Sequence, residues 1–214
     1  MNNYKKFMVG IDPGFGQTGL VLRDSASQDA LAWYTWTAGT GDEFTRGMAM
    51  AQCVVDALVL LTEEYSMEDA TLSAAIEMHI WNRNTVTYRM QTRLLDQIES
   101  GIMAVVTPLV GRLLLVEHMP GTAKKAATGS GYATKEDIIK EAKTRFPADL
   151  WESSLAQGNK DTAHTLADAW AHSLVAGYPF SGFHDVNPDA ITVRDLTDLR
   201  PHAIKALAEG RASE

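Results

Sequence analysis

The sequence has few of the features of a secreted or membrane protein. Its one cysteine, Cys53, cannot form an intramolecular disulfide and has no Cys or His partner at zinc-site spacing, which favours a reducing, cytosol-like compartment. The longest apolar stretch, residues 51–62, is interrupted by Asp56, so we expect no membrane span. The first residues lack the apolar segment and cleavage site of a signal peptide. We therefore expect a cytoplasmic protein with no membrane contact.

Basic residues are in the minority, with 19 Lys and Arg against 27 Asp and Glu and a net charge of −8. This balance argues against indiscriminate binding of nucleic acid, because phosphate contacts require Lys and Arg, although it is compatible with a local basic patch. Hydrophobic residues make up 45% and charged residues 21% of the 214-residue chain, which is typical of a folded globular protein.

Strand and helix patterns alternate along the chain, which predicts an α/β fold with a sheet flanked by helices. The expected strands are residues 7–11, 20–22, 31–37, 72–76 and 112–116, and the expected helices are 43–65, 82–99, 135–144 and 161–175. The Gly-, Ala- and Lys-rich stretch 120–134 predicts a loop. The proline-containing residues from 177 onward predict an appended tail with one weak helix.

Three carboxylates stand where active-site acids are often found. Asp12 follows a buried strand at a glycine turn, Glu77 ends a second strand, and Asp168 lies on an otherwise apolar helix. Mg²⁺ prefers oxygen ligands, and pairs of divalent cations roughly 3.5–4 Å apart hydrolyse phosphodiesters. The plain alternatives are that Asp12 starts a turn, Glu77 is an exposed strand end and Asp168 forms an ion pair.

The turn from Gly14 to Gly19 also matches the G-x-G-x-x-G pattern of dinucleotide-binding proteins. In that motif the glycines lead into a helix whose N-terminus binds pyrophosphate. Here they lead into a predicted strand, and Asp12 would repel phosphate, so we reject a dinucleotide site.

Four segments taken in order resemble the RuvC-type Holliday junction endonucleases of the RNase H-like superfamily. The segments are GIDPGFGQTG, AAIEMHIWNRN, the pattern P-x3-K-x4-G-x-G-x3-K starting at Pro120, and LADAWAHSL, and together they span residues 7 to about 178. The resemblance implies a mixed five-stranded sheet flanked by helices, and a homodimer that nicks four-way junctions with two Mg²⁺ or Mn²⁺ ions per active site. The loose match favours a phage-encoded member.

Carried over residue by residue, the resemblance makes Asp12, Glu77 and Asp168 catalytic acids and metal ligands. The family usually has Asp or His three residues before the last acid, where this sequence has Thr165. His164 and Asp161 both fall on nearly the same helical face as Asp168. We favour His164 as the substitute ligand or proton-transfer group, and Asp161 or no fourth ligand remain the alternatives.

The resemblance also implies a DNA-binding surface and a wedge residue that enters the junction. The candidate DNA-binding residues are Lys124, Lys125, Lys135, Arg83, Arg89, Gly129 and Gly131, with Arg93 on the same helical face as Arg89. Glycines let the backbone approach phosphates closely, and lysines supply the charge. Ile80 or Trp81 is the candidate wedge, and a buried core tryptophan is the competing interpretation of Trp81.

These observations together predict a nuclease domain over residues 1–178 and a C-terminal extension over residues 179–214. The predicted activity is metal-dependent nicking of four-way and other branched DNA in the cytoplasm of a bacterium or of a phage-infected host. One alternative is a catalytically silent junction-binding protein, based on Thr165. The other is an ATP-binding protein of the actin and sugar-kinase type, which the chain length disfavours because those proteins close two such domains around the nucleotide.

Overall fold

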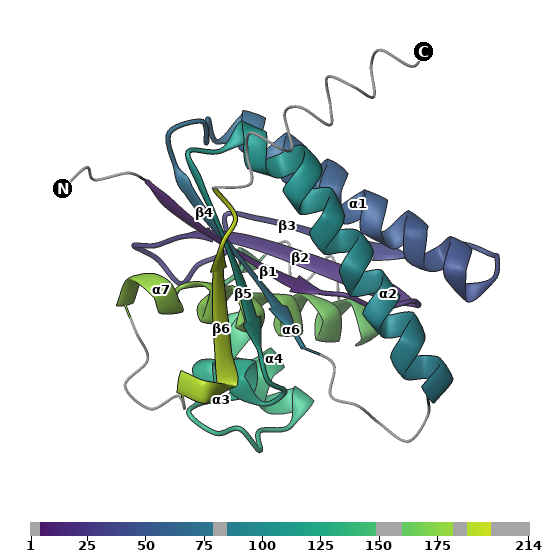
Figure 1. The fold of residues 1–214 in the computed structure, drawn as a ribbon. Helices are drawn as coiled ribbons and strands as arrows, with labels where there is room; N and C mark the ends of the chain where they lie inside the picture. The colour runs from purple at the N-terminus through teal and green to yellow at the C-terminus, as the bar shows by residue number, and fades with distance from the viewer. Residues whose placement is uncertain (1–4, 79–84, 149–159, 182–187, 198–214) are drawn as a thin grey trace, which may run out of the picture.

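A single mixed sheet with helices on both faces forms the body of the protein (Figure 1). The computed structural model describes residues 5–78, 85–148, 160–181 and 188–197. The strands are β1 (Lys6–Asp12), β2 (Gln17–Asp24), β3 (Ala32–Thr37), β4 (Thr71–Glu77), β5 (Arg112–His118) and β6 (Ile191–Asp195). The helices are α1 (Glu43–Glu64), α2 (Thr85–Gly101), α3 (Thr122–Thr128), α4 (Lys135–Lys143), α6 (Lys160–Ala176) and α7 (Tyr178–Ser181). The predicted α/β class is confirmed.

The sheet has the strand order β3-β2-β1-β4-β5-β6, so it contains six strands where five were expected. The strands β1, β4 and β5 run parallel, while β2, β3 and β6 are antiparallel to their neighbours. The sixth strand lies in the segment 179–214, for which the sequence predicted no strand. The domain boundary at residue 178 stays a prediction, but residues 191–195 belong to the main sheet.

Side chains alternate between the two faces of the sheet, as the pleat of a strand requires. In β1, Phe7, Val9 and Ile11 pack into the core under α1 and α2, whereas Met8 packs into a second core under α6. The helices α3 and α4 complete the α6 side. Each face is therefore a separate hydrophobic layer, and the parallel strands between them are almost entirely buried.

The helix α1 is the one described helix whose length and apolar composition would also suit a membrane span. Its N-terminus is capped by Asp42, whose carboxylate accepts a hydrogen bond from the Thr45 backbone N–H at 2.8 Å. Val54, Leu58 and Leu61 are buried in the core that α1 shares with the sheet and α2. This burial is typical of a core helix in a globular domain.

The predicted loop over residues 120–134 is partly wrong, because Thr122–Thr128 forms α3. Gly121 and Gly129 take left-handed backbone conformations on either side of this helix, and the Gly129 N–H donates to the Lys125 carbonyl as a C-terminal cap. Gly121 and Gly129, which favour a loop in the sequence pattern, mark the two ends of a short helix. The predicted helix over 82–99 is described only from Thr85, and its continuation is a π-helical turn, Ile102–Val106, followed by the 3₁₀ turn Thr107–Leu109.

Candidate active site

The carboxyl ends of three parallel strands meet at one edge of the sheet and carry Asp12, Glu77 and His118. Ile11 pairs with Ile76, so Asp12 and Glu77 occupy the next position on neighbouring strands, and Glu77 pairs in turn with His118. The alternation along β1 turns Asp12 to the same side as Met8, which packs in the α6 core. The sheet therefore presents these three polar side chains to α6.

The helix α6 brings Asp168 to this edge because it packs unusually closely on the sheet. A Cβ atom at Gly10 would lie 1.9 Å from the Ala169 carbonyl oxygen, and one at Gly19 would lie 2.6 Å from Thr165 Cγ2. Only glycine permits this approach. Gly10 lies two residues before Asp12 and faces the residue after Asp168, so the contact positions the two carboxylates relative to each other.

The three carboxylates lie close enough to affect one another electrostatically. Burial raises the pKa of Asp12 to about 7, and the negative charges of Asp168 and Glu77 add to the effect. Burial and Asp168 raise the pKa of Glu77, and burial raises that of Asp168. The cluster thus holds more negative charge than its own surroundings neutralise.

Two predicted DNA-binding lysines lie near this cluster. Lys135 lowers the pKa of Asp12 and of Asp168, and Lys124 lowers that of Glu77 and of Asp168. Lys124 also donates a hydrogen bond from Nζ to the Ala133 carbonyl at 3.1 Å, which ties α3 to the segment before α4. These lysines therefore lie close to the acids, while their role in binding DNA stays a prediction.

The glycine loop between α3 and α4 is held by its own hydrogen bonds. The Thr128 hydroxyl donates to the Lys124 carbonyl at 2.8 Å, and Ser130 Oγ accepts from the Tyr132 N–H at 3.3 Å. The Tyr132 side chain is 99% exposed, a position that the sequence analysis did not single out. The loop thus presents an uncovered aromatic ring to solvent.

His164 and Thr165 differ clearly in their surroundings. His164 is half-buried one helical turn before Asp168, and its charge lowers the pKa of that carboxyl. Thr165 is buried against Gly19, and its hydroxyl donates to Gln17 Oε1 at 3.4 Å, so it faces the β1–β2 hairpin. The side chain of Asp161 lies outside the part of the structure that can be described. His164 is thus the described neighbour of Asp168 that could supply a further ligand.

The sequence analysis missed a buried pair of histidines beneath the acids. His172 Nδ1 lies 3.0 Å from His118 Nε2, and His118 Nδ1 lies 3.2 Å from the Met119 carbonyl oxygen. One ring nitrogen of each histidine and a Glu77 carboxylate oxygen all lie within 4.8 Å of one another, as the ligands of one metal ion would. His172 follows Asp168 by four residues and His118 ends β5, so helical spacing and strand register together were a usable signal.

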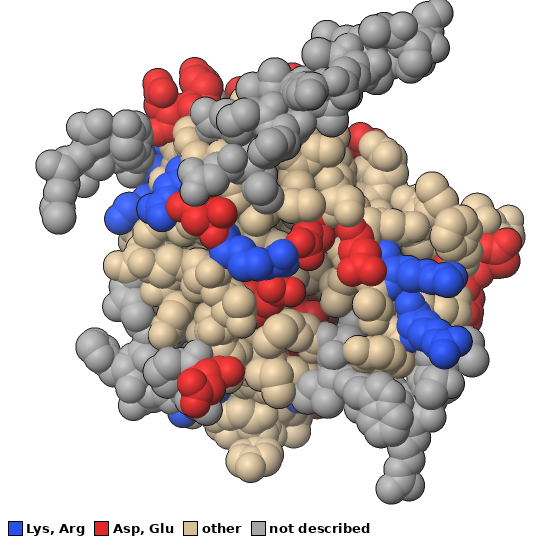
Figure 2. All heavy atoms as spheres, in the orientation of Figure 1, with Lys and Arg blue, Asp and Glu red and all other residues tan. Residues whose placement is uncertain are grey.

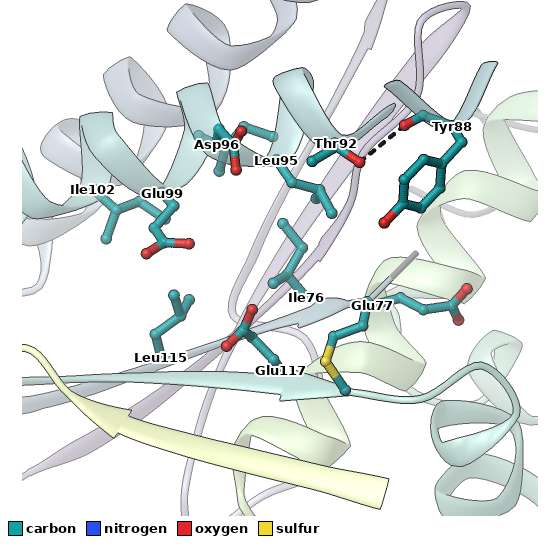
Figure 3. Close-up of a pocket in the computed structure, with 12 residues that line it drawn as sticks. Ile76, Glu77, Tyr88, Thr92, Leu95, Asp96, Glu99, Ile102, Leu115 and Glu117 are labelled. Carbon is teal, nitrogen blue, oxygen red and sulfur yellow. Dashed lines mark hydrogen bonds between the residues drawn. The ribbon is translucent and has the colours of Figure 1, made fainter. Parts of the chain in front are cut away.

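A cavity of about 210 Å³ lies on the other face of the sheet, between α2 and the strands β4 and β5. Figure 3 shows Glu77 at its margin with the carboxylate turned away from the other lining residues, while Glu99 and Glu117 extend into it. Arg194 pairs with both glutamates, at 2.6 Å to Glu99 and 3.0 Å to Glu117. These two acids thus share one arginine and stand apart from the acid cluster.

The arginines of α2 lie on the surface. Arg89 and Arg93 are both exposed, and Figure 2 shows basic side chains gathered over the lower part of α2 in that view. Gly129 is exposed and Gly131 half-buried in the glycine loop. The predicted wedge residues Ile80 and Trp81, together with Arg83, lie outside the described residues.

No protein-family model matches the chain. Among curated proteins, the crossover junction endodeoxyribonuclease RuvC of Rickettsia typhi is 31% identical over 176 residues, covering 80% of this chain and 99% of the relative. RuvC of Rickettsia felis is 30% identical over 167 residues, covering 76% and 94%. RuvC of Salinibacter ruber is 26% identical over 198 residues, covering 86% and 98%.

Solved structures show the same fold. A Thermus thermophilus RuvC structure aligns with a TM-score of 0.51, covering 82% of this chain and 96% of that one at 16% identity. Thermus thermophilus RuvC in complex with a Holliday junction substrate aligns with a TM-score of 0.55, also at 16% identity. Because the match to its curated relatives extends over nearly their whole length, the chain belongs to the RuvC family of crossover junction endodeoxyribonucleases.

Proposed function

We propose that this protein is a metal-dependent endonuclease that nicks four-way DNA junctions and other branched DNA. The observation that carries the proposal is the coupling of Asp12, Glu77 and Asp168, which come from three elements and meet at one edge of the sheet. Membership of the RuvC family supports DNA junctions as the substrate. Membership of this family also argues against the alternative of an ATP-binding protein of the actin and sugar-kinase type.

The acid cluster fits divalent cations. Its carboxylates have raised pKa values because they are buried, and in Asp12 and Glu77 also because neighbouring carboxylates repel the charged form. A bound cation offsets both effects. Asp12, Glu77 and Asp168 would hold the ions, with His164 as the fourth ligand or proton-transfer group. Two Mg²⁺ or Mn²⁺ ions per active site would activate water and stabilise the leaving oxygen.

The chain's own residues orient the DNA and balance charge. Lys124 and Lys135 lie close enough to affect the carboxylates and would bind the phosphates on either side of the scissile bond. Hydrolysis joins a water oxygen to phosphorus and releases a sugar hydroxyl, which takes up a proton. His164, half-buried beside Asp168, is placed to supply that proton.

The DNA-facing surface would extend from the acid cluster in two directions. Lys125, Gly129 and Gly131 continue it along the glycine loop, where the exposed ring of Tyr132 is free to stack on a base. Arg89 and Arg93 would continue it along α2, with Arg83 and the wedge residue Ile80 or Trp81 before that helix. Shape rather than base sequence would then select the substrate.

We also propose a homodimer, because symmetric nicking of two strands at a four-way junction requires two active sites. A cytoplasmic location is part of the same proposal. The C-terminal residues 179–214 would add β6 to the nuclease fold and contribute an extension of undefined role. A catalytically silent junction-binding protein is the second candidate, since Thr165 is turned away toward Gln17.

The test is incubation of the purified protein with a labelled four-way junction and with a matched linear duplex, each in Mg²⁺, in Mn²⁺ and in EDTA. We expect paired, metal-dependent nicks at the junction only, and loss of nicking with retained binding in Asp12→Asn. Binding without nicking in every metal would favour the silent protein. Undiminished nicking by Asp12→Asn would overturn the assignment of the acid cluster.

A further inference from the structure

Two histidines that the proposed mechanism does not use lie close to Glu77. His118 is fully buried and His172 is 4% exposed, so neither is a surface residue. They reach this place from different elements, since His118 ends β5 beside Glu77 in the sheet register and His172 lies on α6. Buried polar groups require partners, and these two rings are partnered with each other.

The distance between the rings suits two ligands of one metal ion. His172 Nδ1 and His118 Nε2 are 3.0 Å apart. Two imidazole nitrogens bound to one ion at about 2.0–2.1 Å, at angles between a right angle and a tetrahedral one, are separated by roughly 2.9–3.4 Å. A Glu77 carboxylate oxygen and one ring nitrogen of each histidine lie within 4.8 Å of one another, so Glu77 completes a set of three donor residues.

The second nitrogen of His118 has the partner expected for a metal-binding histidine. Its Nδ1 lies 3.2 Å from the Met119 carbonyl oxygen, which can only accept, so Nδ1 carries the proton and Nε2 keeps its lone pair. A backbone carbonyl in this role fixes the tautomer and the orientation of a ligating ring. His172 would bind through Nδ1 once its proton moves to Nε2, so that both rings stay neutral.

We propose that Glu77, His118 and His172 form a second cation site, selective for a first-row transition ion such as Zn²⁺, Mn²⁺ or Co²⁺ over Mg²⁺. Imidazole nitrogens favour such ions, whereas Mg²⁺ favours an all-oxygen set such as Asp12 and Asp168 supply. Glu77 belongs to both sets. An ion at the histidine pair would therefore hold the Glu77 carboxylate at the edge of the acid cluster.

The proposal is tested by metal binding in the absence of DNA, so its outcome is independent of the nuclease activity. Co²⁺ is added to the metal-free protein and its visible absorption bands are followed, and the bound Co²⁺ is then displaced with Zn²⁺. We expect one tightly bound Co²⁺ per chain that excess Mg²⁺ does not displace. Loss of either ring, in His118→Gln or His172→Asn, should weaken binding by at least about 10- to 100-fold.

The variant Asp12→Asn is the matched control, because it changes the acid cluster and leaves all three donors in place. Its Co²⁺ bands should persist. Absence of Co²⁺ bands from the wild-type protein would overturn the proposal. Bands that survive in both histidine variants but disappear in Asp12→Asn would also overturn it, because the ion would then lie in the acid cluster.

Both substituted positions are buried, so a second measurement avoids variants altogether. Titration of the ¹⁵N-labelled wild-type protein with Zn²⁺ should shift the ring-nitrogen signals of His118 and His172, two of its six histidines. Unchanged ring signals at saturating Zn²⁺ would show that the two histidines form only a neutral hydrogen-bonded pair, and would reject the site.

Discussion

Gly10 in β1 lies directly against the backbone of α6, where a Cβ atom would come within 1.9 Å of the Ala169 carbonyl oxygen. The same Cβ would lie 2.2 Å from the Ser173 backbone nitrogen, so a full turn of the helix is in contact with this one residue. Asp12 follows Gly10 by two residues, and Asp168 immediately precedes Ala169. The closeness of the sheet and the helix thus determines how near the two acids lie.

Replacement of Gly10 by alanine should therefore damage both stability and activity. The added methyl meets backbone rather than a flexible side chain, so α6 must move away, and overpacking of this kind costs about 1–3 kcal/mol. Asp168 moves with the helix, so we expect junction cleavage to fall more steeply than the folded fraction does. Urea unfolding and single-turnover cleavage measure the two effects.

Gly39 provides the control for Gly10, since nothing lies within 4 Å of a Cβ built there. Gly39→Ala should change the free energy of unfolding by less than about 0.5 kcal/mol. A Gly10→Ala protein as stable and as active as Gly39→Ala would show that α6 tolerates displacement and that the contact does not position Asp168.

The ionised Asp12 carboxylate should destabilise the metal-free protein at neutral and higher pH. Its pKa is raised from 3.8 to about 7, so the folded state binds the proton more tightly than the unfolded state does. The free energy of unfolding then falls as pH rises from about 4 to 7, and the penalty is complete above pH 7. In EDTA at pH 8, Asp12→Asn should be more stable than wild type by roughly 2–4 kcal/mol.

Magnesium should reverse this comparison. In wild type the cation binds the carboxylates and raises the melting temperature, whereas Asp12→Asn should gain much less. The difference between the two proteins should also be small at about pH 3, below the unfolded-state pKa of 3.8, where Asp12 is mostly protonated in both states. Equal stability of wild type and Asp12→Asn in EDTA at pH 8 would mean that Asp12 is not under electrostatic strain.

The acids were predictable from the sequence and the histidine pair was not, for a physical reason. Asp12 and Glu77 end strong apolar runs, so their place at a sheet edge follows from local pattern alone. His118 lies two residues past the predicted end of its strand. For His172 the sequence pattern indicates only a position inside a helix. Only the parallel pairing of β4 with β5 and the close packing of α6 join them to Glu77.

The structure of β6 and α3 depends on contacts and caps that the local sequence pattern does not show. β6 is short and flanked by proline, with no strong alternation, and it forms because β5 offers an unpaired edge and Arg194 pairs with Glu99 and Glu117. The helix α3 lies in a Gly-, Ala-, Thr- and Lys-rich stretch whose composition predicts a loop, and Gly121 and Gly129 cap its two ends. In both cases tertiary contacts or caps outweigh the propensity of a short sequence.

His164 and Thr165 can be separated as candidates for the fourth active-site position. His164→Ala should lower the cleavage rate by about 10²-fold or more, the usual contribution of a proton-transfer group, with junction binding unchanged. Thr165→Val keeps the packing on Gly19 and should cleave within a few-fold of wild type. Partial rescue by His164→Asp would indicate a ligand role, and full activity of His164→Ala would leave Asp161 or no residue at this position.

The lysines of α3 should contribute to the salt dependence of junction binding. If Lys124 and Lys125 each contact a phosphate, each alanine substitution should reduce the slope of log K against log salt by about one. Lys143→Ala, an exposed lysine at the far end of α4, should leave the slope unchanged. Slopes are measured by fluorescence anisotropy in EDTA, and identical slopes for all three variants would remove the α3 lysines from the DNA surface.

The histidine pair should make the metal-free protein sensitive to mild acid. Burial lowers the pKa of His118 to about 4 and holds that of His172 well below 6.5. Below pH 6.5 the unfolded state therefore binds more protons than the folded state does. The free energy of unfolding is therefore at its full value above pH 6.5 and falls as pH drops toward 4, by about 1.4 kcal/mol per pH unit for each histidine.

The raised pKa values of the three acids act in the opposite direction over part of this range. The difference in slope between wild type and a His118→Gln/His172→Asn double variant isolates the pair, because the acids are common to both proteins. Urea unfolding in EDTA from pH 7.5 to 4.5 should give the double variant the shallower loss, and equal slopes would mean that both histidines titrate normally in the folded protein.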